Sequence, residues 1–191
     1  FSKGSTSGTA FDVAIKYKNA KAAQLLSPYR IELKTRVIFQ NEFAVGIQSN
    51  EIFLTPSPRL CTVMVLFDND AKVAIMAHLD LITEAFSVLY SINQALKKSG
   101  KSITDYNFKA WLMGGGDREG ALATLINEID LDLSYKRQND LKHLLKCLGI
   151  DHEIIPLTKD LDKRTQITLD TNTGKTTILK SDNHYVDNYQ A

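Results

Sequence analysis

The chain has 191 residues, of which 43% are hydrophobic and 24% are charged, and its formal net charge is +1. These proportions are typical of a globular domain with a sizeable core, and the scattered basic residues argue against a general nucleic-acid-binding surface. No apolar run reaches the roughly 18 residues that a membrane span needs, so no membrane partner is expected.

The first forty residues predict a lead-in, a helix and a strand. Residues 1–9 are mostly small and polar and are expected to form a flexible lead-in, which leaves residues 10–191 as one domain. Residues 10–26 carry apolar side chains at helical spacing. Residues 29–40 alternate apolar and polar side chains, which predicts a strand.

The middle of the chain predicts further strands. Residues 43–54 indicate one or two strands, and residues 62–67 and 72–77 indicate two more around the strong turn signal Asp68-Asn69-Asp70-Ala71. These last two runs are apolar on both faces. Their hairpin is therefore expected inside a sheet that is covered on both sides.

The second half of the chain predicts two helices and four extended segments. The predicted helices cover residues 79–98 and 133–148, and the apolar stripe expected for the first consists of Ile82, Phe86, Leu89, Ile92 and Leu96. The predicted extended segments cover residues 107–113, 153–157, 165–171 and 175–179, the last two as a hairpin.

The register of the central hairpin is expected to bring Cys61 and His78 together. A turn centred on Asn69-Asp70 makes Asp68 face Ala71. Extending the same ladder makes Cys61 and His78 directly opposed residues, with Cβ atoms roughly 4.5–5.5 Å apart on one face. A loop of three or five residues would instead place the two side chains on opposite faces.

A thiol beside an imidazole is a combination that serves nucleophilic catalysis. A free thiol, with a pKa of about 8.5, is mostly protonated at neutral pH, and an adjacent imidazole can take the proton and hold the thiolate as an ion pair. Thr55 could orient the imidazole, and the backbone N–H groups around Leu60 and Cys61 are candidates for an oxyanion hole. The alternative is a structural cysteine with an incidental histidine neighbour, the commoner case for an isolated buried cysteine.

Three other groups of residues are candidate binding sites. His143, Cys147 and His152 could form part of a zinc site, but a fourth ligand is missing, and packing of Cys147 is the favoured interpretation. Gly114-Gly115-Gly116 lacks the lysine and hydroxyl of a phosphate-binding loop, and a tight strand exit is favoured. A third group, without calcium-loop spacing, consists of Asp160, Asp162 and Asp170.

Thr55, Cys61 and His78 are separated by six and then seventeen residues. This spacing resembles the catalytic triad of the CheD family of chemoreceptor glutamine deamidases, which shares a catalytic core with the cytotoxic necrotizing factor toxins. The resemblance covers roughly residues 43–180. Weaker matches follow in the same order: the segments 45–55, 63–78 and 109–116, then Arg164 and Gly174.

The chain also departs from the family. Arg59-Leu60 stand before the cysteine where the family has Gly-Ser, and residues 158–163 are polar where the family has glycines. Residues 117–130 form a longer stretch than usual, and the first 40 residues have no counterpart. These departures argue against a routine chemotaxis enzyme, and a divergent relative, such as a secreted bacterial effector or toxin that deamidates a host protein, fits them as well or better.

The resemblance implies a CheD-like layered α/β sandwich, with a mixed, largely antiparallel sheet flanked by helices, and the activity of a protein glutamine deamidase. Cys61, His78 and Thr55 would hydrolyse a side-chain amide through a thioester, without a metal or organic cofactor. The implied partner is a protein that presents a glutamine, in the cytoplasm of the producing bacterium or of a host cell. One alternative is an inactive CheD-like module that acts through protein–protein contacts, and another is a small-molecule amidase.

Overall fold

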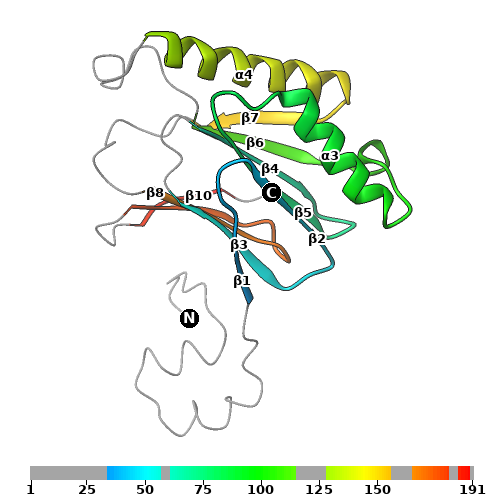
Figure 1. Ribbon diagram of the computed structural model, residues 1–191. Coiled ribbons are helices and arrows are strands. Elements are labelled where there is room, and N and C mark those ends of the chain that lie inside the picture. Colours follow the sequence, from blue (N-terminus) through cyan, green and yellow to red (C-terminus); the bar gives the residue numbers. More distant parts are fainter. Residues whose placement is uncertain (1–33, 57–60, 115–127, 156–164, 181–184, 190–191) are drawn as a thin grey trace, which may run out of the picture. The chain divides into compact units, whose positions relative to one another are not determined.

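The computed structural model describes residues 34–56, 61–114, 128–155, 165–180 and 185–189 (Figure 1). The chain divides into two units, Phe1–Leu33 and Lys34–Ala191, and every described residue belongs to the second. The lead-in and the helix expected before residue 34 therefore lie outside the described residues.

The described strands form two five-stranded sheets. The first has the order β1 (Lys34–Val37), β3 (Glu51–Pro56), β8 (Thr165–Asp170), β9 (Thr176–Lys180) and β10 (Tyr185–Tyr189). The second has the order β2 (Glu42–Ile47), β5 (Val73–Leu79), β4 (Thr62–Asp68), β6 (Lys109–Gly114) and β7 (Asp151–Ile155). Only β1–β3 and β6–β7 pair in parallel. The predicted α/β class and the largely antiparallel pairing are confirmed, with the strands divided between two sheets.

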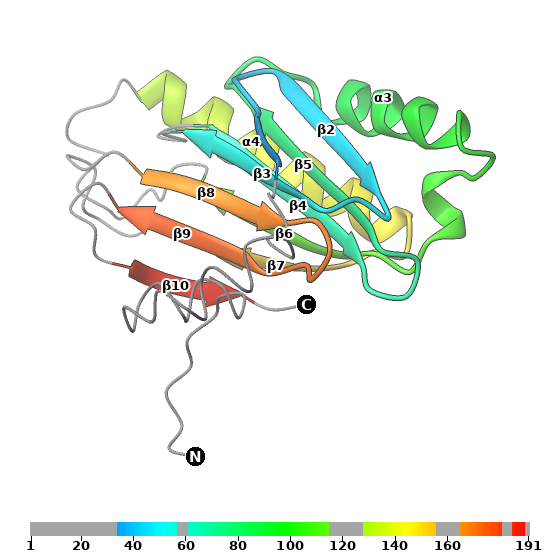
Figure 2. The same cartoon turned by 90° about the horizontal axis from the view of Figure 1, so that it is seen from below.

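The second sheet is covered on both faces, because the residues of β4 and β5 are all buried. One face packs on the first sheet, with Val63 and Phe67 in the same apolar cluster as Phe53 of β3. The other face, with Met64 and Leu66, packs on α3 (Ala85–Lys97) and α4 (Glu128–Cys147). Figures 1 and 2 show these helices on the side of the second sheet that is away from the first. The covered hairpin is thus confirmed.

The register of the β4–β5 hairpin differs from the prediction by two residues. Asp68 faces Val73, so the turn is centred on Asp70-Ala71 rather than on Asn69-Asp70. The Asp68 carboxylate accepts the backbone N–H groups of Asp70 and Ala71, both at 2.9 Å, which stabilises a four-residue loop. His78 therefore faces Val63, and the predicted direct opposition of Cys61 and His78 is wrong. Because the shift is even, it does not change the face of any side chain.

The helix predicted over residues 79–98 begins later, at Ala85. Strand β5 continues through Leu79, and the Asp80 carboxylate then accepts the backbone N–H groups of Ile82 and Thr83, which forms a turn before the helix. As a consequence Ile82 and Phe86 are 81% and 66% exposed. The buried remainder of the predicted stripe consists of Leu89, Ile92 and Leu96.

The other elements largely follow the sequence pattern. The second long helix, α4, begins five residues before its predicted start, and the chain leaves it at Gly149, which has a φ of 70°. A short 3-10 helix, η2, covers Ile103–Asp105, and β10 lies in a tail for which no strand was predicted. Within the described ranges, no helix combines the length and the apolar character of a membrane span.

Candidate functional site

The imidazole of His78 is buried and bound to a threonine of the other sheet. His78 is 4% exposed, and its Nδ1 lies 2.6 Å from Oγ1 of Thr55, which is fully buried on β3. The same hydroxyl lies 2.8 Å from the carbonyl oxygen of Ile38. The structure thus places Thr55 where the sequence analysis expected it, against the ring of His78.

These two contacts determine the tautomer of His78. A hydroxyl has one proton, and the Ile38 carbonyl can only accept it, so Thr55 donates to Ile38. Nδ1 of His78 must then donate its own proton to Thr55, which leaves Nε2 with a lone pair. Nε2 is buried and has no hydrogen-bond partner among the described residues. The contacts of Thr55 therefore leave His78 with an available base.

Cys61 is half-buried and stands directly before β4. If the alternation of β4 is continued, its side chain shares a face with Val63, which directly opposes His78. Cys61 and His78 are therefore diagonal neighbours, whose Cα atoms are typically about 7–8 Å apart. The shift in register therefore keeps the two residues on one face but removes the direct opposition that was predicted.

The electrostatics favour a neutral pair. Burial raises the pKa of the Cys61 thiol; the positive charge of Arg137 opposes this rise and the negative charge of Asp80 adds to it. Burial and then Arg137 lower the pKa of His78, while Asp80 and the Ile38 carbonyl act in the opposite direction. These shifts favour a protonated thiol at Cys61 and a neutral imidazole at His78, and they disfavour the expected thiolate–imidazolium pair.

Arg137 is a residue of this region that sequence reasoning missed. It projects from α4, is 4% exposed, and donates from Nη2 to Oγ1 of Thr62 at 3.1 Å. A signal was available, because Arg137 precedes Leu141 by four residues and Leu145 by eight. That spacing puts it on the buried face of the helix, where an arginine needs a specific partner.

Asn41 and Asp80 were missed as well, and they brace the end of β5. The backbone N–H of Asn41 donates to the His78 carbonyl at 2.7 Å, and its side-chain amide donates to Asp80 at 2.6 Å. Asn41 adopts a φ of 65°, a conformation in which asparagine is enriched. Although burial opposes it, these bonds and those from Thr83 lower the pKa of Asp80, so a negative charge is held beside the site.

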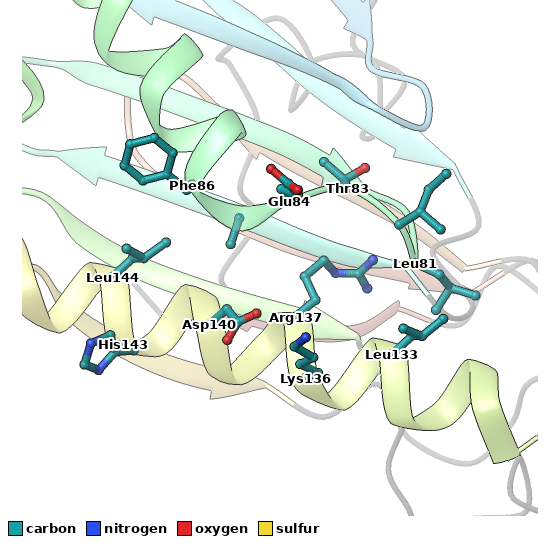
Figure 3. Close-up of a pocket in the computed structure, with 12 residues that line it drawn as sticks. Leu81, Thr83, Glu84, Phe86, Leu133, Lys136, Arg137, Asp140, His143 and Leu144 are labelled. Atoms are coloured by element: carbon teal, nitrogen blue, oxygen red, sulfur yellow. The ribbon is translucent and has the colours of Figure 1, made fainter.

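A groove lies between α4 and the segment that joins β5 to α3. Its volume is about 590 Å³, and Figure 3 shows Arg137 extending from α4 toward that segment. Neither Cys61 nor His78 lines the groove. Arg137 lines the groove, and its guanidinium also donates to Thr62 at the start of β4.

The other sequence candidates do not form a site. Within the described ranges, no three His, Cys, Asp or Glu residues are close enough to hold a metal ion. Cys147 lies 3.6 Å from His143 but is exposed, so its expected packing role is wrong. Gly114 ends β6 with a φ of 80°, as expected for a tight strand exit, and Asp170 accepts backbone N–H groups in the β8–β9 turn. The remaining candidates, including Arg59 and Leu60, lie outside the described residues.

The comparisons with known proteins give little guidance. No family model matches the chain, and no curated protein matches it. Among solved structures, a Neisseria meningitidis protein of the family DUF152 is similar over 75% of this chain and 71% of its own, with a TM-score of 0.43 and 12% sequence identity.

Proposed function

We propose that this chain is a cysteine-dependent protein glutamine deamidase, with Cys61 as nucleophile, His78 as proton carrier and Thr55 as the residue that orients His78. The observation that carries the proposal is the Nε2 atom of His78. It is buried, has no partner among the described residues, and belongs to a ring whose tautomer Thr55 determines, on the face that Cys61 shares. The triad spacing of the CheD-like deamidases supports the same assignment.

The chemistry follows from the neutral pair. The Cys61 sulfur attacks the carbonyl carbon of a glutamine side chain while its proton passes to Nε2 of His78. The tetrahedral adduct collapses, the imidazolium returns that proton to the nitrogen, and ammonia leaves a thioester. Water then attacks the thioester, with His78 accepting a proton and returning it to the sulfur, which releases glutamate and the thiol.

The position of Cys61 supports a protein substrate. The thiol is half-buried at the start of a strand rather than inside the sheet, so a side chain that another protein presents can reach it. The reaction uses no cofactor and requires a reduced thiol. A reducing compartment, the cytoplasm of a bacterium or of a host cell, meets that requirement.

An inactive binding module is the second candidate. Two observations favour it: the raised pKa of the Cys61 thiol, and exposed apolar side chains before α3 and in its first two turns, namely Ile82, Phe86 and Tyr90. This candidate needs neither Cys61 nor His78 for its activity.

Ammonia release and intact mass separate the candidates. Wild type, Cys61→Ser and Cys147→Ser would be incubated with casein, a bacterial lysate and free glutamine. We expect ammonia and a gain of about 1 Da per modified glutamine of a protein, lost by about 10³-fold or more in Cys61→Ser and retained in Cys147→Ser, because covalent catalysis needs that nucleophile.

Cys147→Ser is the matched control, because it removes the second thiol, which also lies beside a histidine. Ammonia from free glutamine alone would point to a small-molecule amidase. Undiminished ammonia release by Cys61→Ser, or no ammonia release by any of the three proteins, would exclude the proposed reaction on these substrates. The binding module would then remain as the candidate function.

A further inference from the structure

Strand β2 is bounded at both ends by the same backbone arrangement. Asn41, directly before the strand, has a φ of 65°, and Gln48, directly after it, has a φ of 48°. The N–H of Asn41 donates to the His78 carbonyl at 2.7 Å, and the N–H of Gln48 donates to the Lys72 carbonyl at 2.8 Å. Left-handed residues other than glycine are uncommon, so both conformations need a local cause. Each of them closes one end of the ladder between β2 and β5.

The side chains differ at the two ends. The Asn41 amide group donates to the Asp80 carboxylate at 2.6 Å, and its oxygen accepts the Asp80 N–H at 3.3 Å and the Thr83 hydroxyl. The side chain of Gln48 is exposed and makes no hydrogen bond within the described ranges. Because the backbone of each turn suffices to close the ladder, the side-chain bonds of Asn41 call for a further role. They occur at the end of the ladder that carries His78.

The segment between β1 and β2, residues 38–41, is bonded to both sheets. At its start, Ile38 donates its N–H to a carbonyl of β3 and accepts the Thr55 hydroxyl on its own carbonyl, both at 2.8 Å. At its end, Asn41 holds the end of β5 through the bonds given above. The bond of 2.6 Å between Thr55 and Nδ1 of His78 therefore crosses between the sheets at the place where this short segment joins them.

The tautomer of His78 depends on where the end of β5 lies. The hydrogen bonds of a histidine ring set which of its nitrogens carries the proton. Thr55 accepts from Nδ1 while its own proton goes to the Ile38 carbonyl, so the ring must stay within reach of that hydroxyl. Movement of His78 away from Thr55 would leave Nδ1 without its acceptor and let the proton occupy Nε2. In that tautomer Nε2 is no longer a base.

We propose that Asn41 is a positioning residue of the candidate site: its side chain holds Asp80, and with it the end of β5, so that His78 keeps its proton on Nδ1 and a lone pair on Nε2. The catalytic part of this inference rests on the proposed function, in which Nε2 accepts the proton of Cys61. The tautomer itself is a property of the free protein and is measured without a substrate.

Nuclear magnetic resonance of the histidine rings measures the tautomer. Long-range proton–nitrogen correlations of isotope-labelled protein at about pH 8, where imidazoles are neutral, show which ring nitrogen carries the proton, and His78→Asn identifies the signals of His78. We expect the proton on Nδ1 in the wild type. Asn41→Asp tolerates the left-handed backbone but puts a carboxylate against Asp80. The fraction of His78 with its proton on Nε2 should then rise about fivefold, the typical net effect of one hydrogen bond.

Glycine variants supply the matched control. Asn41→Gly removes the side chain and keeps the left-handed backbone, and Gln48→Gly makes the same change at the other end of the ladder. The tautomer should shift in Asn41→Gly and stay unchanged in Gln48→Gly. In the ammonia assay, kcat should fall about fivefold in both Asn41 variants while KM stays within about twofold, since the change concerns the base and not the binding of substrate. Gln48→Gly should match the wild type.

Circular dichroism and thermal unfolding identify the variants that fold. If neither Asn41 variant folds, Asp80→Ala removes the same side-chain bond from the other residue and should shift the tautomer in the same direction. A wild-type ring with its proton on Nε2, an unshifted tautomer in a folded variant of Asn41 or Asp80, or an equal shift in Gln48→Gly overturns the inference. A shift confined to the Asn41 and Asp80 variants, without ammonia release by the wild type, leaves the positioning role standing and contradicts the deamidase.

Discussion

Asp68 and His78 are buried polar side chains at opposite ends of the hairpin formed by β4 and β5. Asp68 is 3% exposed and His78 is 4% exposed. The Asp68 carboxylate accepts three backbone N–H groups: Oδ1 binds Asp70 and Ala71, and Oδ2 binds Asn107 at 2.7 Å. His78 binds Thr55 through one ring nitrogen and leaves the other without a partner among the described residues.

The difference in hydrogen bonding distinguishes a structural polar residue, Asp68, from a candidate catalytic residue, His78. Folding selects buried polar groups whose hydrogen-bonding capacity is used, because an unmade bond in the interior costs about 1–3 kcal/mol. Asp68 satisfies that rule and holds a turn. His78 departs from it at the atom that could accept a proton from Cys61, and a departure of this kind calls for an explanation beyond stability.

The largest effect is expected for His78→Asn. The asparagine amide keeps a donor near the position of Nδ1, so the bond to Thr55 can persist, but it has no atom at the position of Nε2. General acid–base catalysis typically contributes 10²–10⁴-fold, so ammonia release should fall about 10³-fold, while the free energy of unfolding changes by less than about 1 kcal/mol. Steady-state assays and urea unfolding measure the two quantities.

Thr55→Val is the control for the orienting contact. It preserves the β-branched shape and removes the acceptor for Nδ1, so the ring keeps its base but loses its fixed tautomer. Activity between those of wild type and His78→Asn is expected. If His78→Asn lost stability and kept its activity, the ring would be a structural group like Asp68, and the comparison would fail.

Asp68→Ala should have the opposite effects to His78→Asn, with a large loss of stability and little loss of activity. It leaves the N–H groups of Asp70, Ala71 and Asn107 without their carboxylate acceptor, two of them in an exposed turn. The free energy of unfolding should fall by about 2–4 kcal/mol, because bonds to a charged group are worth about 1.5–3 kcal/mol each and water replaces part of them. Chemical denaturation with a fluorescence readout from Trp111 measures this loss.

Activity per folded molecule in Asp68→Ala should stay within about twofold of wild type, since Asp68 lies at the far end of the hairpin from Cys61. A loss of activity much larger than the unfolded fraction explains would show that the turn determines the register on which the site depends. The structural and the catalytic ends of the hairpin would then be coupled.

The same hairpin shows how far the sequence predicts the site. The apolar runs, the turn signal and burial on both faces are local patterns, and each of them predicted the structure correctly. The register depends on the local geometry of the turn, in which the Asp68 carboxylate accepts the N–H groups of Asp70 and Ala71. The face shared by Cys61 and His78 was predictable, because an even shift preserves it, whereas their direct opposition was not.

Contacts between segments that are distant in the sequence could not be predicted from local sequence patterns. The bond from His78 to Thr55 joins two sheets, and the bond from Arg137 to Thr62 joins residues 75 positions apart. The triad spacing of the family that the chain resembles pointed to Thr55. Arg137 could have been identified by extending the buried face of α4 one turn before its leucines. The late start of α3 was also missed, because the spacing of apolar residues does not show that the Asp80 carboxylate binds the backbone of the turn before the helix.

The smallest effect concerns pH, and it distinguishes a neutral pair from an ion pair. Burial and Arg137 lower the pKa of His78, so its neutral form persists below the ordinary value of about 6.5. The contribution of this group to folding stability is therefore complete above about pH 6.5 and is lost as the pH falls below it, because the unfolded chain binds the proton more readily. Activity should follow the same direction, with kcat/KM roughly constant from pH 7 to 8.5 and about tenfold lower at one unit below the lowered pKa.

The pH dependence of kcat/KM above pH 7 distinguishes a neutral thiol–imidazole pair from a thiolate–imidazolium ion pair. An ion pair needs the imidazolium, so its rate would fall as the pH rises through a raised histidine pKa. A neutral pair predicts no such fall, because Cys61, whose thiol pKa burial raises, still carries the proton that His78 must receive. A decline between pH 7 and 8.5, measured while circular dichroism shows the fold intact, would mean that the unpartnered nitrogen is protonated in the working enzyme and that Arg137 does not keep His78 neutral.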